Sequence, residues 1–445
     1  SAERFEQTSA WINSTFNGDF LPVSRGAFAR LSDLALDFLR AIMRRSAQVP
    51  MNFQPVNLGL DTPLAWDELD FAHIPAGVLS QVYEHQVERW DPNRRKQDSV
   101  YYTPRRIAEY MVREAFARLD VLNVPRCDAR VLDPSVGGGV FLVAAFREMV
   151  ADWRRRNGRW PSSRRLRAML YRQLAGFDIQ DSALSLTSLS LYLTVIELDA
   201  PPYRFEDLRF DQPLRGSVLF ALGEPAVSDD APESGSLGRA VPAGHEGQYD
   251  VVIGNPPWTS LPGDVGRQVI EDATELLRPV VEARLGPERA REFVIPDQVP
   301  DLPFVWRAMT WARPGRVLAF ALHARLLFKS TPQGRRARED LFGALSVWGL
   351  LNGADLRFTP VWPEVLQPFC LLFADNVRPP TDHVFYLSSP YFEPALNESG
   401  RLRIDPDALQ PIAPARLQEV PWLLKALFRG TPLDLSMIGG EDLLK

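Results

Sequence analysis

The chain has 445 residues, with 50 Lys and Arg against 56 Asp and Glu, which gives a formal net charge of −6. This length predicts two or three compact units, and the acidic balance is not that of a simple duplex-binding module. No apolar run reaches membrane-spanning length, so we expect a cytoplasmic protein with no membrane partner. Cys127 and Cys370 are far apart and the five histidines are scattered, so we predict reduced thiols and no metal site.

The first 98 residues are predicted to be helical, because apolar side chains recur at helical spacing between residues 31 and 42. This N-terminal helical domain, 1–98, is either a cap on the domain that follows or a DNA-facing unit, and we favour the cap. Residues 99–104 then read Ser-Val-Tyr-Tyr-Thr-Pro and lead into a helix. We predict Thr103 as the N-cap of that helix and Pro104 as its first residue.

Residues 131–142 predict a short apolar strand that ends in Asp133, a glycine-rich loop and a helix. Glycine lets a backbone approach a ligand closely, and a helix start presents unpaired N–H groups. The loop lacks the third glycine of the dinucleotide fingerprint, which disfavours an NAD-type oxidoreductase, although simple turn chemistry remains an alternative. A second predicted strand, 174–179, carries Asp178 near its end, where a carboxylate is able to accept both hydroxyls of a ribose.

A buried-type strand at 250–254 runs directly into an Asn-Pro-Pro-Trp turn at 255–258. The two prolines stiffen the turn and remove two backbone donors. The side-chain carbonyl of Asn255 and the backbone carbonyl of Pro256 are then able to accept from one exocyclic amino group, and Trp258 offers a face to a planar base. The alternative is a rigid turn with a buried Trp.

In this order, the motifs YYTP, DPxxGxGxF, GxD and NPPW resemble those of the class I, S-adenosylmethionine-dependent N6-adenine DNA methyltransferases. The resemblance is nearest to the branch of Eco57I-like enzymes and type I modification subunits, and it covers about residues 10–375. It implies an α/β fold, a Rossmann-like methyltransferase sheet with flanking helices, at residues 99–375. It also implies S-adenosylmethionine as the cofactor and double-stranded DNA as the partner.

The resemblance assigns roles to single residues. The residues implied for cofactor binding are Tyr102, Thr103, Pro104, Asp133, Pro134, Gly137, Gly139, Phe141, Asp178 and Ser217. Ser217 stands where the family has an Asp or Asn that meets the adenine of the cofactor. The implied catalytic residues, which hold the target adenine, are Asn255, Pro256, Pro257 and Trp258. A second stacking aromatic is expected before the strand at 369–373, with Trp362 preferred over Phe358 and a buried structural Trp as the alternative.

Three further segments complete the organisation. Residues 221–248 lack periodicity and predict a flexible surface insertion, whereas 264–312 predict a helical insertion that either closes over the site or extends the surface. An arginine-rich stretch at 154–167 is either a solvated face or a phosphate contact. Residues 376–445 form a C-terminal extension toward a recognition domain that is not evident, so we expect sequence recognition from a continuation of the chain or a partner subunit.

The implied function is site-specific adenine-N6 methylation of DNA, with the target base flipped out of the duplex, in a restriction–modification or related phage-defence system. Two alternatives stay open. One is a methyltransferase that acts on RNA adenine, cytosine N4 or a protein glutamine. The other is a catalytically silent methyltransferase-fold subunit that only binds DNA within a defence complex.

Overall fold

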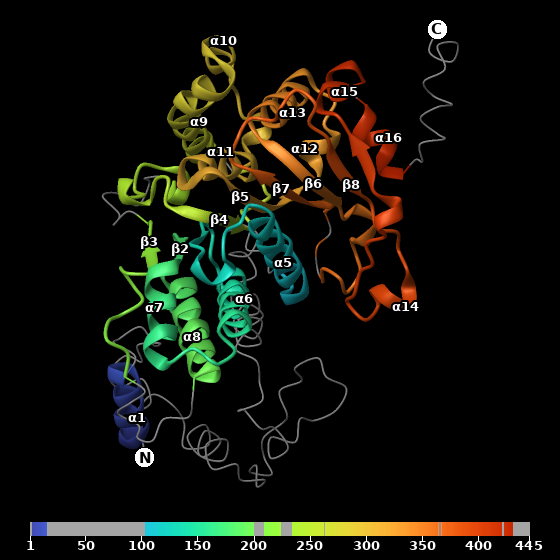
Figure 1. Cartoon of the computed structure of the whole chain (residues 1–445). Helices are drawn as coiled ribbons and strands as arrows, with labels where there is room; N and C mark the ends of the chain where they lie inside the picture. Colours follow the sequence, from blue (N-terminus) through green and yellow to red (C-terminus); the bar gives the residue numbers. More distant parts are fainter. Residues whose placement is uncertain are drawn as a thin grey trace, which may run out of the picture.

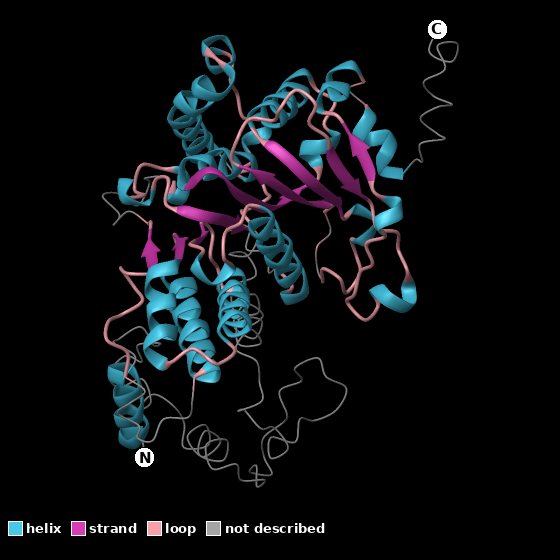
Figure 2. Cartoon of the chain, in the orientation of Figure 1, coloured by secondary structure: helices cyan, strands magenta, loops and turns pink. Residues whose placement is uncertain are grey.

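The computed structural model describes residues 2–15, 103–199, 209–223, 234–261, 263–363, 365, 367–420 and 422–429 (Figures 1 and 2). Helix α1 (Ala2–Thr15) is the part of the predicted N-terminal domain that falls within these ranges. The rest of that domain, including Tyr102 of the YYTP motif, lies outside the described residues. The final residues of the predicted C-terminal extension, 430–445, lie outside them as well.

The described residues form one nine-stranded sheet, in the order β3-β2-β1-β4-β5-β7-β6-β8-β9. Strands β3, β2, β1, β4 and β5 are parallel neighbours, and β7 inserts antiparallel between β5 and β6. Strand β8 pairs with β6 in parallel and β9 pairs with β8 antiparallel. The strands are β1 (Val131–Asp133), β2 (Leu174–Asp178), β3 (Leu219–Ala221), β4 (Tyr249–Gly254), β5 (Ala312–His323), β6 (Ser346–Asn352), β7 (Phe369–Asp375), β8 (Phe385–Ser388) and β9 (Gln410–Ile412).

Helices cover both faces of the sheet, as Figure 2 shows. The first face carries α5 (Arg105–Val121), α6 (Val140–Asn157), α7 (Ser163–Gln173) and α8 (Asp181–Leu198). The second face carries α9 (Gly263–Leu285), α10 (Pro287–Arg291), α11 (Asp301–Trp311), α12 (Arg325–Phe328), α13 (Pro332–Ala344), α15 (Pro414–Glu419) and α16 (Leu423–Arg429), whereas α14 (Pro394–Asn397) lies on a loop between β8 and β9. The short 3-10 turns are η3 (Arg126–Asp128), η5 (Gly235–Leu237), η6 (Ala243–His245), η7 (Pro296–Gln298), η8 (Ala354–Leu356) and η9 (Pro406–Ala408).

The core has two layers because the strands are apolar on both faces. In β4, Val251 and Ile253 pack toward α5–α8, whereas Val252 packs toward α9 and α11. A strand buried on both faces reads as a continuous apolar run, and this is the pattern of residues 250–254. The predicted fold class, an α/β methyltransferase-like sheet with flanking helices, is therefore confirmed.

Two predicted segments differ in the structure. Residues 234–248 are not a flexible surface insertion, because Leu237 and Val241 are buried in the second layer of the core. Within the predicted C-terminal extension, the described residues include β8 and β9, which continue the sheet. Neither segment has a clear hydrophobic period in the sequence. Its apolar runs are short, and they pack against strands that are distant in the sequence. Residues 263–285 and 301–311 are helical and pack on the sheet.

Candidate functional site

The parallel strands β1, β2 and β4 end at the same edge of the sheet, and the candidate site lies there. Strand β1 pairs with β2 on one side and with β4 on the other. The chain runs outward from β1 through β2 to β3 and then returns to β4, so the strand order reverses between β1 and β4. In open α/β sheets this reversal opens the crevice in which ligands bind. The glycine loop after β1 and the NPPW turn after β4 flank that crevice.

The glycine loop is held by contacts from two other elements. Gly137 and Gly139 have φ values of +48° and +81°, which glycine adopts most readily. The Gly137 N–H donates to Asp178 at 2.9 Å, and the Thr187 hydroxyl of α8 donates to the Gly137 carbonyl at 2.6 Å. A Cβ on Gly139 would come within 2.8 Å of the Thr187 methyl, whereas a Cβ on Gly137 would meet nothing within 4 Å. The loop is therefore packed on one side and open beside Gly137.

Asp178 lies at the carboxyl end of β2 and contacts the backbone on both sides. One carboxylate oxygen accepts from Gly137 and the other accepts from the Gln180 N–H at 2.9 Å. Burial raises the pKa of Asp178, and the backbone N–H groups of Gln180 and Gly137 oppose that rise. Each oxygen has two lone pairs, so both keep capacity for a further donor. The side chain thus fixes the glycine loop and still has acceptors at the site.

Asp133 connects the two halves of the site. It is fully buried, its Oδ1 accepts from the Ser135 N–H at 3.1 Å, and the same oxygen lies 3.0 Å from where a Cβ on Gly254 would stand. Burial raises the pKa of Asp133 to about 8, the Ser135 N–H lowers it, and the charge of Asp178 raises it further. Gly254 immediately precedes Asn255, so close packing of a glycine against Asp133 brings the NPPW turn to the glycine loop.

Asn255 and Thr103 form a direct contact between the NPPW turn and the start of α5. The side-chain amide of Asn255 donates to the Thr103 hydroxyl at 2.9 Å, so its carbonyl oxygen faces the opposite way. The predicted capping role of Thr103 is wrong, because Pro104 is the N-cap of α5 and that helix start has no side-chain cap. Thr103 is buried, and its hydroxyl accepts the hydrogen bond from Asn255, which is far away in the sequence.

The aromatic residues predicted to stack on the target base occupy two different environments. Trp258 and Trp362 are fully buried and contact each other, with ring centroids 5.1 Å apart and an angle of 60°. The Trp258 indole N–H donates to the Ala321 carbonyl at 3.2 Å, and Trp362 packs on Phe369. Phe358 is 66% exposed and has a φ of +63°. The two indoles thus lie in the environment of buried structural tryptophans, which was the alternative to base stacking. Of these three rings, Phe358 is the accessible one.

The remaining predicted cofactor residues also divide. Pro134 and Phe141 are both buried. Pro134 directly follows β1, on one side of the glycine loop, and Phe141 follows that loop at the start of α6. Ser217, in contrast, precedes β3, and its hydroxyl donates to the carbonyls of Pro213 and Leu214. Because Ala221, at the far end of β3, is the residue opposite Asp178, Ser217 lies toward the other edge of the sheet. The contact of Ser217 with the cofactor stays a prediction, and this position does not favour it.

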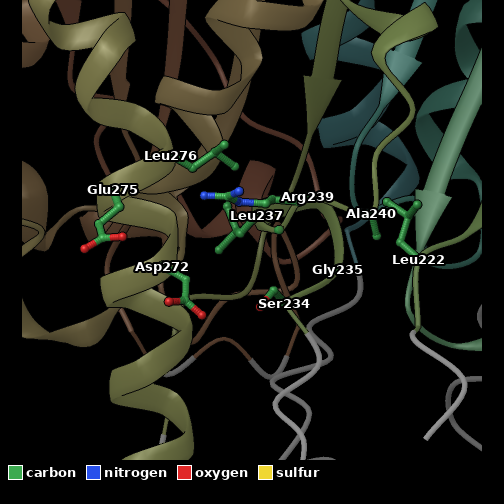
Figure 3. Close-up of a pocket in the computed structure, with 10 residues that line it drawn as sticks. Leu222, Ser234, Gly235, Leu237, Arg239, Ala240, Asp272, Glu275 and Leu276 are labelled. Atoms are coloured by element: carbon green, nitrogen blue, oxygen red, sulfur yellow. The ribbon is translucent and has the colours of Figure 1, made fainter. Parts of the chain in front are cut away.

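A cavity of about 300 Å³ lies at the carboxyl end of β3 (Figure 3). Leu222, directly after β3, lines it together with the loop around Gly235 and with Asp272 and Glu275 of α9. A Cβ on Gly235 would come within 2.5 Å of the side chain of Ile179, the residue that follows Asp178. The cavity therefore shares the sheet edge of Asp178.

Sequence reasoning missed two residues of the site, Thr187 and Arg325. Thr187 fixes the glycine loop from α8, and Arg325 donates from Nη2 to the Trp258 carbonyl at 3.0 Å. Neither belongs to a motif, and no signal in the sequence places them at the site. The one related feature is that α8 buries several small hydroxyl side chains, including Ser188 and Thr194.

Residues 76–274 match the sequence model of the N-6 DNA Methylase family. Among solved structures, the chain is similar to the ATP-dependent Type ISP restriction-modification enzyme LlaBIII bound to DNA, with 12% identity and a TM-score of 0.53 over 90% of this chain and 26% of that chain. The DrdV–DNA complex gives 13% identity and a TM-score of 0.51 over 73% of this chain and 31% of that chain. A type I restriction-modification system methyltransferase subunit from Streptococcus thermophilus gives 15% identity and a TM-score of 0.45 over 93% and 74%.

The likenesses to LlaBIII and DrdV support the fold, and the chain spans less than a third of the length of each. No curated protein matches the chain by sequence. Among the residues that the structure describes, no helix is both long and apolar enough to span a membrane.

Proposed function

Starting from the assignment of residues 76–274 to the N-6 DNA methylase family, we propose that this chain transfers a methyl group from S-adenosylmethionine to N6 of an adenine flipped out of DNA. The observation that carries the proposal is the hydrogen bond between Asn255 and Thr103 at the point where the strand order reverses. It brings the NPPW turn and the YYTP motif together beside the glycine loop. Two motifs that are separated in the sequence thus share one crevice.

The residues around the glycine loop fit S-adenosylmethionine. The space beside Gly137 is open, the loop leads into the start of α6, and Asp178 keeps lone pairs for ribose hydroxyls. Gly137, Gly139 and Asp178 would hold the cofactor, with Thr103 and Pro104 on the side of the NPPW turn. When bound, the cofactor supplies a methyl carbon that its sulfonium has already activated.

Asn255 and Pro256 would position the amino group. The side-chain carbonyl of Asn255 faces away from Thr103, and both this oxygen and the Pro256 carbonyl are acceptors for the two N6 hydrogens. Accepting both hydrogens directs the nitrogen lone pair toward the methyl carbon and stabilises the positive charge that grows on nitrogen as the new bond forms. The nitrogen then loses one proton to solvent. Holding two reactants in this geometry is worth several kcal/mol, on the order of 7–11 in well-oriented cases.

The partner we propose is double-stranded DNA, in a restriction–modification or related defence system. LlaBIII and DrdV are each in complex with DNA, and the N-6 DNA Methylase match supports the same class of substrate here. Flipping a base costs roughly a few kcal/mol, which a positioned slot must offset. Recognition of the DNA sequence would come from a further domain or a partner subunit.

The test is transfer of a tritiated methyl group to unmethylated genomic DNA, duplex and heat-denatured, followed by nucleoside analysis. We expect the label in N6-methyladenine, and Asn255→Ala should remove it. Asn157→Ala is the matched control, because Asn157 is an exposed residue at the far end of α6 that bonds only the Trp153 carbonyl. Label in N4-methylcytosine, or in no nucleoside although calorimetry shows cofactor binding, would contradict the proposal.

A further inference from the structure

Residues 321–325, at the carboxyl end of β5, contact both segments that would enclose the target base. One segment is the NPPW turn with Trp258, and the other is the loop before β7 with Trp362. These two segments come from distant parts of the sequence, and the Trp258–Trp362 contact and the end of β5 join them. The end of β5 is therefore the element that relates one segment to the other.

The first segment is held by two hydrogen bonds to Trp258. The indole N–H donates to the Ala321 carbonyl at 3.2 Å, and the Arg325 guanidinium donates to the Trp258 backbone carbonyl at 3.0 Å. The ring and the backbone of one residue are thus both fixed to β5 and the start of α12. A hydrogen bond from a charged donor is stronger than a neutral one. The bond from Arg325 is therefore the stronger of these two.

The second segment is held by His323 and Ala324. The Ala324 N–H donates to the Pro368 carbonyl at 2.9 Å, and His323 Nε2 contacts Gln367 Oε1. The Arg325 N–H donates to His323 Nδ1 at 2.8 Å, so Nδ1 is the acceptor and Nε2 carries the proton that Gln367 accepts. Burial, together with the charge of Arg325, lowers the pKa of His323 to about 4, which keeps this neutral tautomer at pH 7.

Asp301 of α11 bonds to the backbone of His323 at the end of β5. It is buried and accepts from the His323 N–H at 3.2 Å. Burial raises its pKa to about 6, and the Leu302 N–H and the charge of Arg325 lower it. Both segments therefore attach to the end of β5, which Asp301 supports through the His323 N–H.

The slot between the two segments is closed in this structure. The centroids of the two indoles lie 5.1 Å apart and the rings are tilted by 60°, whereas a base stacked between two rings needs about 7 Å, twice the base-stacking distance of roughly 3.4 Å. A base therefore enters only if the segments separate. The hydrogen bonds from β5 hold each segment in its present position.

We propose that Arg325 and His323 are positioning residues for the target base: Arg325 fixes the Trp258 segment, and His323 fixes the Trp362 segment through Gln367. This inference rests on the proposed function. Each hydrogen bond fixes its own segment, and the two together fix where the two indoles lie relative to each other.

The test is hydrogen–deuterium exchange on the full chain, with Arg325→Met and Gln367→Leu compared with Arg335→Met. Arg335 is an exposed arginine of α13 whose Nε donates to the Ser330 carbonyl. We expect Arg325→Met to raise exchange about tenfold in peptides that contain Trp258, the effect of losing one charged hydrogen bond. Gln367→Leu should raise exchange in peptides that contain Trp362 and leave the Trp258 peptides unchanged.

The activity measurement uses unmethylated genomic DNA. Arg325→Met should lower kcat about tenfold or more with an unchanged Kd for S-adenosylmethionine, and Arg325→Lys, which keeps the charge, should recover part of the loss. Unchanged exchange in both segments, or equal increases throughout the sheet, would overturn the inference. The exchange measurement needs no turnover, so a chain that methylates nothing would contradict the proposed function while this result still decides the role of Arg325. If Arg325→Met fails to fold, exchange in Arg325→Lys decides the role of Arg325, and Gln367→Leu decides the role of His323.

Discussion

The two halves of the candidate site are built in different ways. The glycine loop is fixed by backbone conformation and by packing, with positive φ at Gly137 and Gly139 and with Asp178 and Thr187 bonded to its backbone. The base slot is fixed by side chains that join distant segments, such as Asn255 to Thr103 and Arg325 to Trp258. A substitution in the first half should therefore affect folding and cofactor binding, whereas one in the second half should affect turnover.

The largest expected effect is on turnover, from Asn255→Ala. Loss of the acceptor for the target amine should lower the methylation rate about 100- to 1000-fold, the usual cost of removing one preorganised polar group from a reaction site. The Kd for S-adenosylmethionine, measured by calorimetry, should stay unchanged, since the role proposed for Asn255 is to hold the target amine and not the cofactor.

Thr103→Val is the matched change on the other side of this hydrogen bond. It should lower kcat about tenfold, because the Asn255 amide loses its fixed orientation. A loss of cofactor affinity with kcat intact would instead assign Thr103 to the cofactor half.

The next effect in size is on stability, from Gly139→Ala against Gly137→Ala. A Cβ on Gly139 meets Thr187 at 2.8 Å in a left-handed backbone conformation, so we expect a loss of about 3 kcal/mol from strain and overpacking together. A Cβ on Gly137 meets nothing, so only about 1–2 kcal/mol of strain is expected, yet its methyl group would enter the open space beside the loop.

Urea unfolding should therefore rank Gly139→Ala as the less stable variant. Calorimetry should show weakened binding of S-adenosylmethionine even in the well-folded Gly137→Ala. Equal stabilities, or full affinity in Gly137→Ala, would show that the cofactor does not approach this loop.

Asp133 should make stability depend on pH. Its folded pKa of about 8 lies above that of an unfolded Asp, so its contribution is complete below about pH 4 and is lost as pH rises through 8. The free energy of unfolding should fall by up to about 1.4 kcal/mol per pH unit between about pH 4 and pH 8, and should level off above pH 8. Asp133→Asn should flatten this slope in urea titrations between about pH 5 and pH 8. A slope that persists in the variant would place the titrating group elsewhere.

The smallest expected effect comes from Thr187→Val, which keeps the shape of the side chain and removes its hydroxyl. Loss of the 2.6 Å hydrogen bond to the Gly137 carbonyl should cost about 1 kcal/mol in urea unfolding. Cofactor affinity should fall slightly, and kcat should not change. A large fall in kcat would mean that the two halves of the site are coupled through α8.

Local patterns were enough to predict the elements of the site. The runs at 131–142, 174–179 and 250–258 gave β1, β2 and β4 with their loops, because a buried parallel strand followed by glycine or proline is a signal within a few residues. Two features were not predicted: the place of Ser217 before β3, and the burial of Leu237 and Val241 within the predicted insertion 221–248. Both depend on register and packing against β2 and the second layer of the core, which no local pattern encodes.

The sequence by itself determined the α/β fold class, the family of residues 76–274 and the conformations that Gly137 and Gly139 require. Only the tertiary structure decided that Thr103 bonds Asn255 instead of capping α5, and that Trp258 and Trp362 pack on each other. The physical reason is range. Backbone conformation follows from neighbouring residues, whereas the partner of a buried side chain is set by which distant segments the sheet brings together.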